Sequence, residues 1–459
     1  MLDKKRIIRL LIFLCALFVS VIVYLNVYYF IKGDSFKKLS YNRRSIAAEN
    51  KILRGSIYDR NGQVLAYTEK AGGERQYNYP KTYSHIIGYS NREYGKSALE
   101  REYNQTLLGI DGLSLDDLLK VRDNREGKSI KLTIDHDLQY YARERLLEKK
   151  GSIIALNPKT GEILAMASYP DFNPADLVNS WKDIIERTDS PLLNRSTQGM
   201  YEPGSVFKVI TSNALIGRID IEEKYHSTGT EKIDGYDFRD ANREGYGELN
   251  LKDAFVISSN TYFTNRVQRI SGVELGKSAD DFYFNRDIPF DLPVKKSVFD
   301  YNKLSKVELS ASAIGQGKIL TTPMNMAVVA SLIANDGEFV QPTLIKSIIN
   351  PNGKEDIRKP IRKATDLDPK KMNMITDMMV ETVEKGTGKG ARIKGIRVAG
   401  KTGTAEKSRN KTNAWFIGFA PAEDPEVVVC VLIEDSKSSG GVEAAPIARN
   451  IIQRALNNK

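Results

Sequence analysis

A serine followed three residues later by a lysine is a candidate nucleophile with its own base, and the sequence contains three such pairs. The serines of these pairs are Ser35, Ser205 and Ser408. Only Ser205 follows a Pro-Gly break that stops the chain directly before an apolar helical pattern. A serine at the amino end of a helix lies beside free backbone N–H groups, which favour developing negative charge. The context therefore selects Ser205.

The lysine of this pair, Lys208, is the candidate base. A serine hydroxyl attacks weakly until a neighbouring base accepts its proton, and no histidine lies near Ser205 in the sequence. Residues three apart on a helix share a face, so the Lys208 amine can reach the Ser205 hydroxyl. A lysine is a base only when neutral, which requires burial or a nearby cation to lower its pKa. The alternative is a helix-capping serine followed by a solvated lysine.

Two later segments carry groups that complement this pair. Ser258-Ser-Asn260 follows a predicted helix over 251–257 and offers a hydroxyl and an amide. Lys401-Thr-Gly-Thr404 lies on a predicted strand, where Gly403 leaves room for a substrate backbone to approach. Similar triplets occur at Ser40-Tyr-Asn42, Ser408-Arg-Asn410 and Lys159-Thr-Gly161. Order and placement separate the candidates from these copies: a serine at a helix start, then a loop, then a late strand.

The elements that must position these residues form two strand clusters separated by helices. Gly151 opens two apolar runs around a Pro/Gly turn, which predicts a hairpin. Later strands are predicted over 396–405, 414–420 and 427–433, followed by a helix over 444–457. Helical patterns lie between the clusters, for example over 206–217 and 322–335. The pattern predicts an α+β domain in which both chain ends build one sheet, covered by helices.

The amino terminus predicts a membrane anchor. Four basic residues within 1–9 precede an apolar run over 10–31, which is long enough to cross a bilayer as a helix. The run is too long for a signal-peptide core and has no small-x-small cleavage site. The basic end predicts a cytoplasmic tail over 1–9 and an exported remainder, although basic residues also follow the span. The remaining chain divides into a mixed pedestal domain over 32–147 and a catalytic domain over 148–459.

Charge and composition exclude several other classes. The net charge of +10 is spread along the chain without a nucleic-acid module, so we expect a basic surface and no nucleic-acid partner. Cys15 lies in the apolar run and Cys430 in a β-like run, which argues against a disulfide between them. The histidines lie far apart and no zinc-ligand spacing occurs, so we expect no metal site and no cofactor.

The three motifs, in this order, resemble the penicillin-binding protein and serine β-lactamase superfamily. Other stretches are similar to class B penicillin-binding proteins, the monofunctional peptidoglycan transpeptidases. They include Arg54-Gly55, Asp59-Arg-Asn-Gly62, Leu99-Glu100, Tyr201-x-Pro-Gly-Ser205, Ala313-Ile-Gly-Gln-Gly317 and Thr322-Pro323. The resemblance implies one transmembrane helix, a dimerisation-like pedestal, and a transpeptidase domain with an antiparallel sheet flanked by helices. It fits the compact members that have no appended wall-binding modules.

The resemblance also implies a role for each residue. Ser205 would attack the penultimate D-alanine of a stem peptide, Lys208 would take its proton, Ser258 would relay that proton, and Lys401 would keep the site positive. Substrate binding would fall to Asn260, Thr402, Gly403 and Thr404. The backbone N–H groups of Ser205 and Thr404 would form the oxyanion hole. β-Lactams would acylate Ser205 because they resemble the acyl-D-alanyl-D-alanine terminus.

Other functions remain open at this point. A β-lactamase is usually far shorter and needs no pedestal or anchor. A D,D-carboxypeptidase would use the same site with water as the acceptor, and a scaffold for wall synthesis would need no chemistry. The resemblance implies a polytopic membrane glycosyltransferase as a partner. It leaves open whether the protein serves elongation, division or sporulation.

Overall fold

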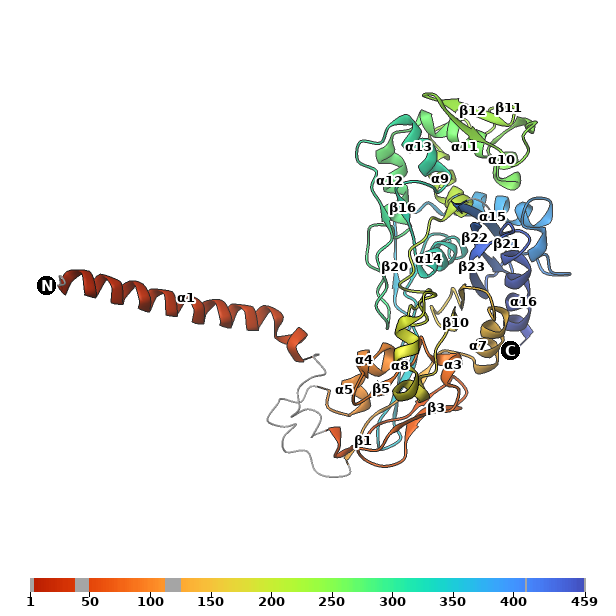
Figure 1. Cartoon of the computed structure of the whole chain (residues 1–459). Helices are drawn as coiled ribbons and strands as arrows, with labels where there is room; N and C mark the ends of the chain where they lie inside the picture. The colour runs from red at the N-terminus through yellow and green to blue at the C-terminus, as the bar shows by residue number, and fades with distance from the viewer. Residues whose placement is uncertain (1–3, 38–48, 112–124, 409–410, 458–459) are drawn as a thin grey trace.

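The computed structural model describes residues 4–37, 49–111, 125–408 and 411–457, so the Ser40-Tyr-Asn42 triplet lies outside the described residues. A long helix extends away from a compact body that has a pedestal at one end (Figure 1). That helix, α1, spans Lys4–Lys37. Its segment Lys4–Leu25 has 22 residues, a mean hydropathy of 2.7 and no buried side chains. At about 1.5 Å per residue this segment matches a bilayer core of about 30 Å, which fits the predicted anchor.

The pedestal is built on a six-stranded sheet that takes strands from two distant parts of the chain. Its order is β19-β18-β8-β2-β3-β4. The bounds are β2 Ile57–Tyr58, β3 Val64–Thr68, β4 Arg75–Tyr77, β8 Ser129–Leu132, β18 Ile345–Ile349 and β19 Glu355–Ile357. The β2–β3 hairpin turns at Asn61-Gly62, a pair that favours tight hairpin turns, and Gly62 has φ +93°. Two of the six strands therefore come from within 148–459.

The smaller pedestal elements surround a buried ion cluster at Glu100 of α4. These elements are β1 Ile52–Leu53, β7 Arg125–Glu126, β5 Ser90–Asn91, β6 Gly95–Lys96, α3 Pro80–Tyr83, α4 Ala98–Glu102 and α5 Asn104–Leu107. Glu100 is fully buried and pairs with Arg54 and Arg75, each at 2.6 Å. Burial raises the pKa of Glu100, but the two arginines lower it more, so the net shift is downward. The Arg54-Gly55 and Leu99-Glu100 stretches thus meet in one structural cluster.

The catalytic domain has a five-stranded antiparallel sheet of order β10-β9-β23-β22-β21. The strands are β9 Gly151–Leu156, β10 Ile163–Tyr169, β21 Ala399–Ser408, β22 Lys411–Ala420 and β23 Val427–Ser436. Strand β9 pairs with β23, so the two predicted strand clusters join in one sheet. This confirms the predicted fold class. The continuous apolar run of β23 follows from its burial on both faces.

Helices cover both faces of this sheet. On one face, α7 (His136–Arg145) and α16 (Ala444–Asn457) pack against alternate residues of β9 and β23. On the other face α14 (Pro323–Ala334) packs against the intervening residues, including the free, buried Cys430. Thr322 caps α14 and Pro323 occupies its first turn, which accounts for the Thr-Pro stretch.

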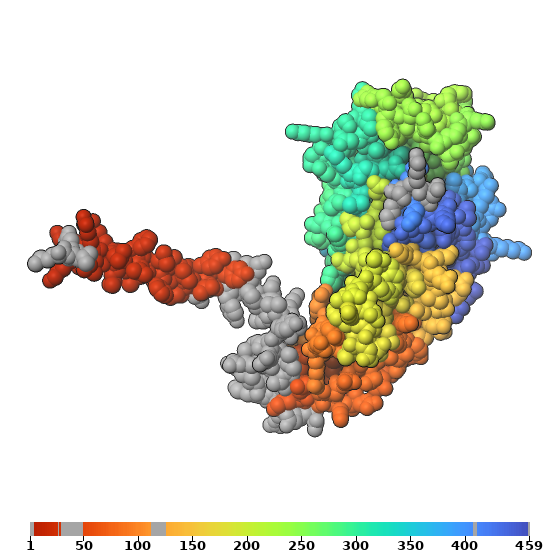
Figure 2. All heavy atoms as spheres, in the orientation of Figure 1, coloured from red at the N-terminus to blue at the C-terminus, as the bar shows by residue number. Residues whose placement is uncertain are grey.

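Most of the remaining elements lie toward the upper end of the molecule, whereas α8 lies lower, beside the pedestal (Figures 1 and 2). The helices are α8 Leu177–Glu186, α9 Lys208–Leu215, α10 Leu251–Ile257, α11 Asn260–Arg266, α12 Gly272–Asp281, α13 Lys306–Ala313 and α15 Pro369–Glu384. The paired short strands are β11 Tyr225–Ser227 with β14 Gly247–Leu249, β12 Thr230–Ile233 with β13 Tyr236–Arg239, β15 Val298–Phe299 with β16 Ile319–Leu320, and β17 Phe339–Val340 with β20 Arg362–Lys363. Four 3₁₀ turns are also described: η1 Pro174–Asp176, η2 Gly204–Phe207, η3 Val267–Arg269 and η4 Lys389–Ala391.

Candidate active site

Ser205 lies in the 3₁₀ turn η2, directly before α9, as its Pro-Gly context predicts. Gly204 has φ +57°, a conformation that favours glycine. Its N–H donates to the Gly315 carbonyl at 2.9 Å, and a Cβ on Gly315 would lie 2.1 Å from the Gly204 oxygen. On the approach to the turn, Tyr201 and Thr321 exchange two backbone hydrogen bonds. The Ala-Ile-Gly-Gln-Gly stretch therefore holds the serine turn in place.

Strand β21 lies directly against this turn because Gly403 has no side chain. A Cβ on Gly403 would lie 2.9 Å from the Pro203 carbonyl oxygen and 3.0 Å from Val206 Cγ1. We expected Gly403 to leave room for a substrate backbone. The space on its Cβ side is instead filled by the enzyme's own turn, so the glycine sets the distance between β21 and Ser205.

Two buried lysines meet at the hydroxyl of Ser258. Both Lys208 and Lys401 are 0 % exposed. Lys208 Nζ donates to Ser258 O and to Asn260 Oδ1, each at 2.7 Å, and lies 3.3 Å from Ser258 Oγ. Lys401 Nζ donates to Ser258 Oγ at 2.9 Å. The three motifs therefore converge on one point, although they lie far apart in the sequence.

Ser205 itself is half-buried, and its hydroxyl makes no hydrogen bond to any described residue. The Lys208 amine, which the helical spacing directs toward Ser205, is turned to Ser258 and Asn260. The serines of the other two Ser-x-x-Lys pairs lie on different elements from Ser205. Ser35 lies near the end of α1, and Ser408 pairs with Lys411 at the end of the β21–β22 hairpin. The structure thus separates Ser205 from these copies.

The backbone of Ser258 is held in an unusual conformation. Ser258 ends α10 with φ 62° and ψ 38°, the left-handed region that non-glycine residues rarely adopt. Such a conformation costs about 1–2 kcal/mol, so the surroundings must enforce it. It presents the Ser258 carbonyl and hydroxyl together to Lys208.

A buried carboxylate that the sequence reasoning missed holds the rest of this segment. Asp240 is 1 % exposed and follows β13. Its Oδ1 accepts from the backbone N–H groups of Asn260 and Thr261, at 2.5 and 3.0 Å. Its Oδ2 accepts from the hydroxyls of Ser227 and Thr261, at 2.9 and 2.7 Å. Ser259 also donates to it. No motif or spacing in the sequence pointed to this residue.

The two lysines differ in what lowers their pKa values. Burial lowers the pKa of Lys208 well below its usual value, and the neighbouring Lys401 lowers it further, while Asp240 acts in the opposite direction. Burial alone lowers the pKa of Lys401 to about 7. Aromatic rings add to this apolar setting, with Phe263 at 5.4 Å from Lys208 Nζ. Burial lowers the pKa of both lysines, and the charge of Lys401 lowers that of Lys208 further, so the cluster favours a neutral Lys208 beside a charged Lys401.

The two threonines of β21 each meet a neighbouring loop. Thr402 is 5 % exposed, and its Oγ1 lies 2.6 Å from Thr387 Oγ1. Thr404 is half-buried, and its Oγ1 accepts from the Gly440 N–H at 3.3 Å. Both hydroxyls can therefore accept from the protein and still have a proton to donate.

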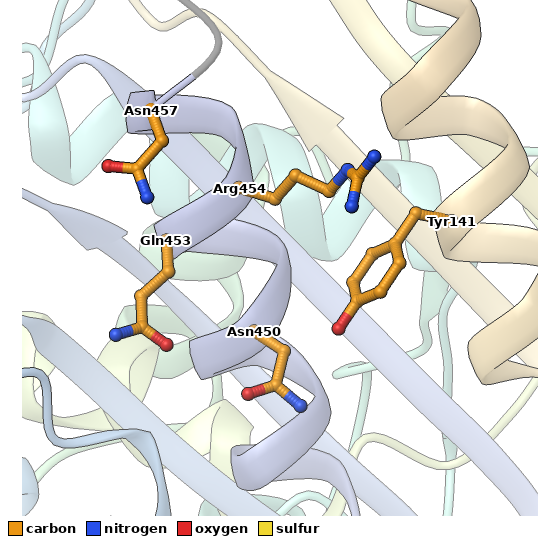
Figure 3. A pocket seen from close by; sticks show the side chains of 5 residues that line it. All are labelled: Tyr141, Asn450, Gln453, Arg454 and Asn457. Carbon is orange, nitrogen blue, oxygen red and sulfur yellow. The ribbon is translucent and has the colours of Figure 1, made fainter.

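A separate polar hollow of about 400 Å³ lies between α7 and α16 and contains none of these residues (Figure 3). It is lined by Tyr141, Asn450, Gln453, Arg454 and Asn457. The Tyr141 ring has the guanidinium groups of Arg145 and Arg454 at 5.0 and 4.8 Å. The contact of Arg454 with Tyr141 joins α16 to α7, which gives the hollow a structural explanation.

Comparison with known families matches two segments of the chain. The penicillin binding protein transpeptidase domain matches residues 151–453, and the penicillin binding protein A dimerisation domain matches residues 54–130. Peptidoglycan D,D-transpeptidase PbpA of Mycolicibacterium smegmatis is 32% identical over 92% of this chain and 93% of its own length. Stage V sporulation protein D of Bacillus subtilis is 32% identical over 93% of this chain and 69% of its own length.

Solved structures agree with these matches. Penicillin-binding protein A from M. tuberculosis, as a ceftriaxone acyl-enzyme complex, has a TM-score of 0.82 and 30% identity, covering 90% of this chain and 100% of that one. The D,D-transpeptidase domain of a peptidoglycan glycosyltransferase from Eggerthella lenta has a TM-score of 0.81 and 33% identity, covering 89% and 99%. Together with the apolar helix α1, these matches confirm the resemblance read from the motifs. The chain belongs to the class B penicillin-binding proteins, as a membrane-anchored serine transpeptidase.

Proposed function

We propose that the protein cross-links peptidoglycan stem peptides through an acyl-enzyme on Ser205. The observation that carries this assignment is the meeting of Lys208 and Lys401 at the Ser258 hydroxyl, on elements packed against the Ser205 turn. The arrangement supplies a nucleophile, a base with a lowered pKa and a proton relay. Among the relatives named above, PbpA of Mycolicibacterium smegmatis is a D,D-transpeptidase and penicillin-binding protein A from M. tuberculosis forms a ceftriaxone acyl-enzyme, which supports the same chemistry.

In the acylation step, Ser205 Oγ attacks the carbonyl carbon of the penultimate D-alanine. A neutral amine carries two hydrogens, and Lys208 has two oxygen acceptors at 2.7 Å, which leaves its lone pair for a hydroxyl proton. The proton of Ser205 passes to Lys208 and then through Ser258 to the nitrogen of the leaving D-alanine. The peptide C–N bond breaks, and the acyl group stays on Ser205.

In the second step, an amine from a neighbouring stem peptide attacks the acyl-enzyme and loses its proton back through the same groups. The new peptide bond is the cross-link, and Ser205 is restored. A β-lactam follows the first step alone, because its ring opens without releasing the nitrogen as a separate product. The charge on Lys401 stabilises the negative charge that develops in both steps.

The substrate-binding roles rest on groups that keep free hydrogens. Asn260 Oδ1 accepts from Lys208, and its Nδ2 donates to the Arg239 carbonyl at 2.9 Å. One amide hydrogen of Asn260 therefore remains for a substrate carbonyl. The Ser205 and Thr404 N–H groups would form the oxyanion hole, and the Thr402 and Thr404 hydroxyls would bind the terminal carboxylate. Gly403 would contribute by holding β21 against the serine turn.

We also propose the topology and the partner that the resemblance implies. Residues 1–9 would be cytoplasmic, 10–31 the span, 32–147 the pedestal and 148–459 the catalytic domain outside the membrane. Strands β18 and β19 would then couple the two outer domains, because they leave the catalytic domain and complete the pedestal sheet. The anchor and pedestal would contact a polytopic glycosyltransferase. Protease added to intact spheroplasts would digest the catalytic domain, and full protection would contradict this orientation.

Labelling with a fluorescent penicillin tests the function. The wild type would keep one stable label, Ser205→Ala would take up none, and Ser180→Ala, which alters a half-buried serine on α8, would label normally. A wild type without label would leave only the scaffold, and rapid loss of label would favour a β-lactamase. Cross-linked product in the presence of an acceptor peptide distinguishes the transpeptidase from a D,D-carboxypeptidase, which would release only hydrolysed donor.

A further inference from the structure

The loop after α15 meets the active-site strand through a pair of hydroxyls. Thr387 is exposed, yet its Oγ1 lies 2.6 Å from the Oγ1 of Thr402, which is 5 % exposed. The loop is pinned on both sides of Thr387. A Cβ on Gly386 would lie 2.1 Å from the Val256 carbonyl oxygen, and a Cβ on Gly441 would lie 2.4 Å from the Thr387 carbonyl oxygen. The hydroxyl pair is therefore held by close backbone packing.

Each hydroxyl has one proton, so the direction of this hydrogen bond decides what Thr402 can do. If Thr402 donates to Thr387, its only proton is used and it can offer a carboxylate nothing but lone pairs. If Thr387 donates to Thr402, the Thr402 proton is free for the carboxylate. An anion in the site favours the second direction, because a chain of hydroxyls ending on a charged acceptor strengthens each bond in it.

Thr404, the other threonine of β21, also has a hydrogen-bond partner in a neighbouring loop. Thr404 Oγ1 accepts from the Gly440 N–H at 3.3 Å, which leaves its proton free to donate. Gly440 and Gly441 are adjacent, so one loop supports the donor to Thr404 and packs against Thr387. Behind each of the two hydroxyls thus lies a protein group that can donate a hydrogen bond to it.

We propose that Thr387 is a positioning residue for recognition of the terminal carboxylate: its hydroxyl donates to Thr402 and so directs the Thr402 proton toward the carboxylate of the donor peptide. This inference rests on the proposed function, because it acts through the carboxylate role of Thr402. The loop that follows α15 would then help select peptides with a free carboxyl end over amidated ones. Its contribution is about tenfold in the acylation rate, the size expected for one charge-assisted hydrogen bond.

Two donor substrates that differ only at the carboxyl end measure this contribution. One is an acyl-D-alanyl thioester ending in a free carboxylate, and the other is the same compound with that carboxylate converted to an amide. The ratio of their acylation kcat/KM values on full-length protein reports carboxylate recognition alone. Thr387→Val would lower the ratio about tenfold, mainly through the carboxylate substrate, and Thr387→Ser would restore it. Thr230→Val, which alters an exposed threonine on β12, would leave it unchanged.

The outcomes separate this inference from the assignment on which it depends. If Thr402→Val lowers the ratio and Thr387→Val does not, the inference is wrong and the proposed role of Thr402 stands. If neither substitution changes the ratio, the carboxylate role of Thr402 fails. If Thr387→Val slows both substrates equally, the residue is only structural, and a lowered melting temperature would accompany that result. If the double variant, with both threonines replaced by valine, lowers the ratio no further than Thr402→Val alone, the two hydroxyls act together.

Discussion

Replacing Asp240 by asparagine tests how the Ser258-Ser-Asn segment is held and how Lys208 is tuned. The substitution keeps the shape of the side chain but removes its negative charge. Oδ1 must stay an oxygen, because it accepts from the two fixed backbone N–H groups of Asn260 and Thr261. The hydroxyls at Oδ2, from Ser227 and Thr261, can rotate to accept from the new amide. The site can therefore keep its geometry without the charge.

The expected loss of stability follows from the bonds that lose charge assistance. A hydrogen bond to a charged group contributes about 1 kcal/mol more than a neutral one, so two backbone bonds lose about 2 kcal/mol in total. Asp240→Ala would instead leave the buried N–H groups of Asn260 and Thr261 unpaired, which costs on the order of 4 kcal/mol. Thermal or denaturant unfolding of the full chain, with the exposed Asp237→Asn as the matched control, measures both.

The same substitution shifts the pH dependence of acylation. Asp240 raises the pKa of Lys208 against the larger effects of burial and Lys401, so removing its charge lowers that pKa further. The limb of kcat/KM that rises as Lys208 loses its proton would move to lower pH in Asp240→Asn. Stopped-flow acylation by a chromogenic β-lactam across pH gives this profile. If Asp240→Asn changes neither the pH of this limb of kcat/KM nor the stability, the role given to Asp240 is wrong.

Two further substitutions test other parts of the site. The pKa of Lys401 is about 7, so wild-type acylation would fall as pH rises through that value; Lys401→Arg, which stays charged, would remove this decline while lowering the maximum rate. If acylation by Lys401→Arg still falls at the same pH, a group other than Lys401 causes the decline. Gly403→Ala would place a Cβ 2.9 Å from the Pro203 oxygen and displace the Ser205 turn, reducing acylation on the order of 100-fold. Penicillin labelling at a wild-type rate would show that the turn absorbs the methyl group.

Much of the catalytic domain could be predicted because its strands are long and strongly apolar. The β23 run reads clearly as a strand because it is buried on both faces. The helix 251–257 agrees with α10 because a capping box at Asn250 and Asp253 starts it and the left-handed Ser258 ends it. The pedestal sheet was harder to predict from the sequence, because β18 and β19 join it from a distant part of the chain and β2 has only two residues.

The site residues also fall into those that could be predicted from the sequence and those that could not. Residues within short motifs, such as Lys208 and Lys401, could be found because their types and spacing already specify chemistry. Asp240 and Thr387 could not, since an aspartate after a strand and a threonine between glycines have many ordinary uses. Their roles come from tertiary contacts, with Ser259 and Thr402 respectively, that no local pattern encodes. The packing role of Gly403 could not be predicted either, because the sequence does not show which backbone will fill the space beside it.

The most direct test of the account is to locate the covalent adduct of a penicillin. The full-length protein is incubated with penicillin G, digested, and analysed by mass spectrometry for a peptide that carries the added mass. We expect a single adduct on Ser205, absent from Ser205→Ala and strongly reduced in a variant with Lys208→Met. An adduct on Ser258 or any other residue, or an unmodified wild type, would contradict it.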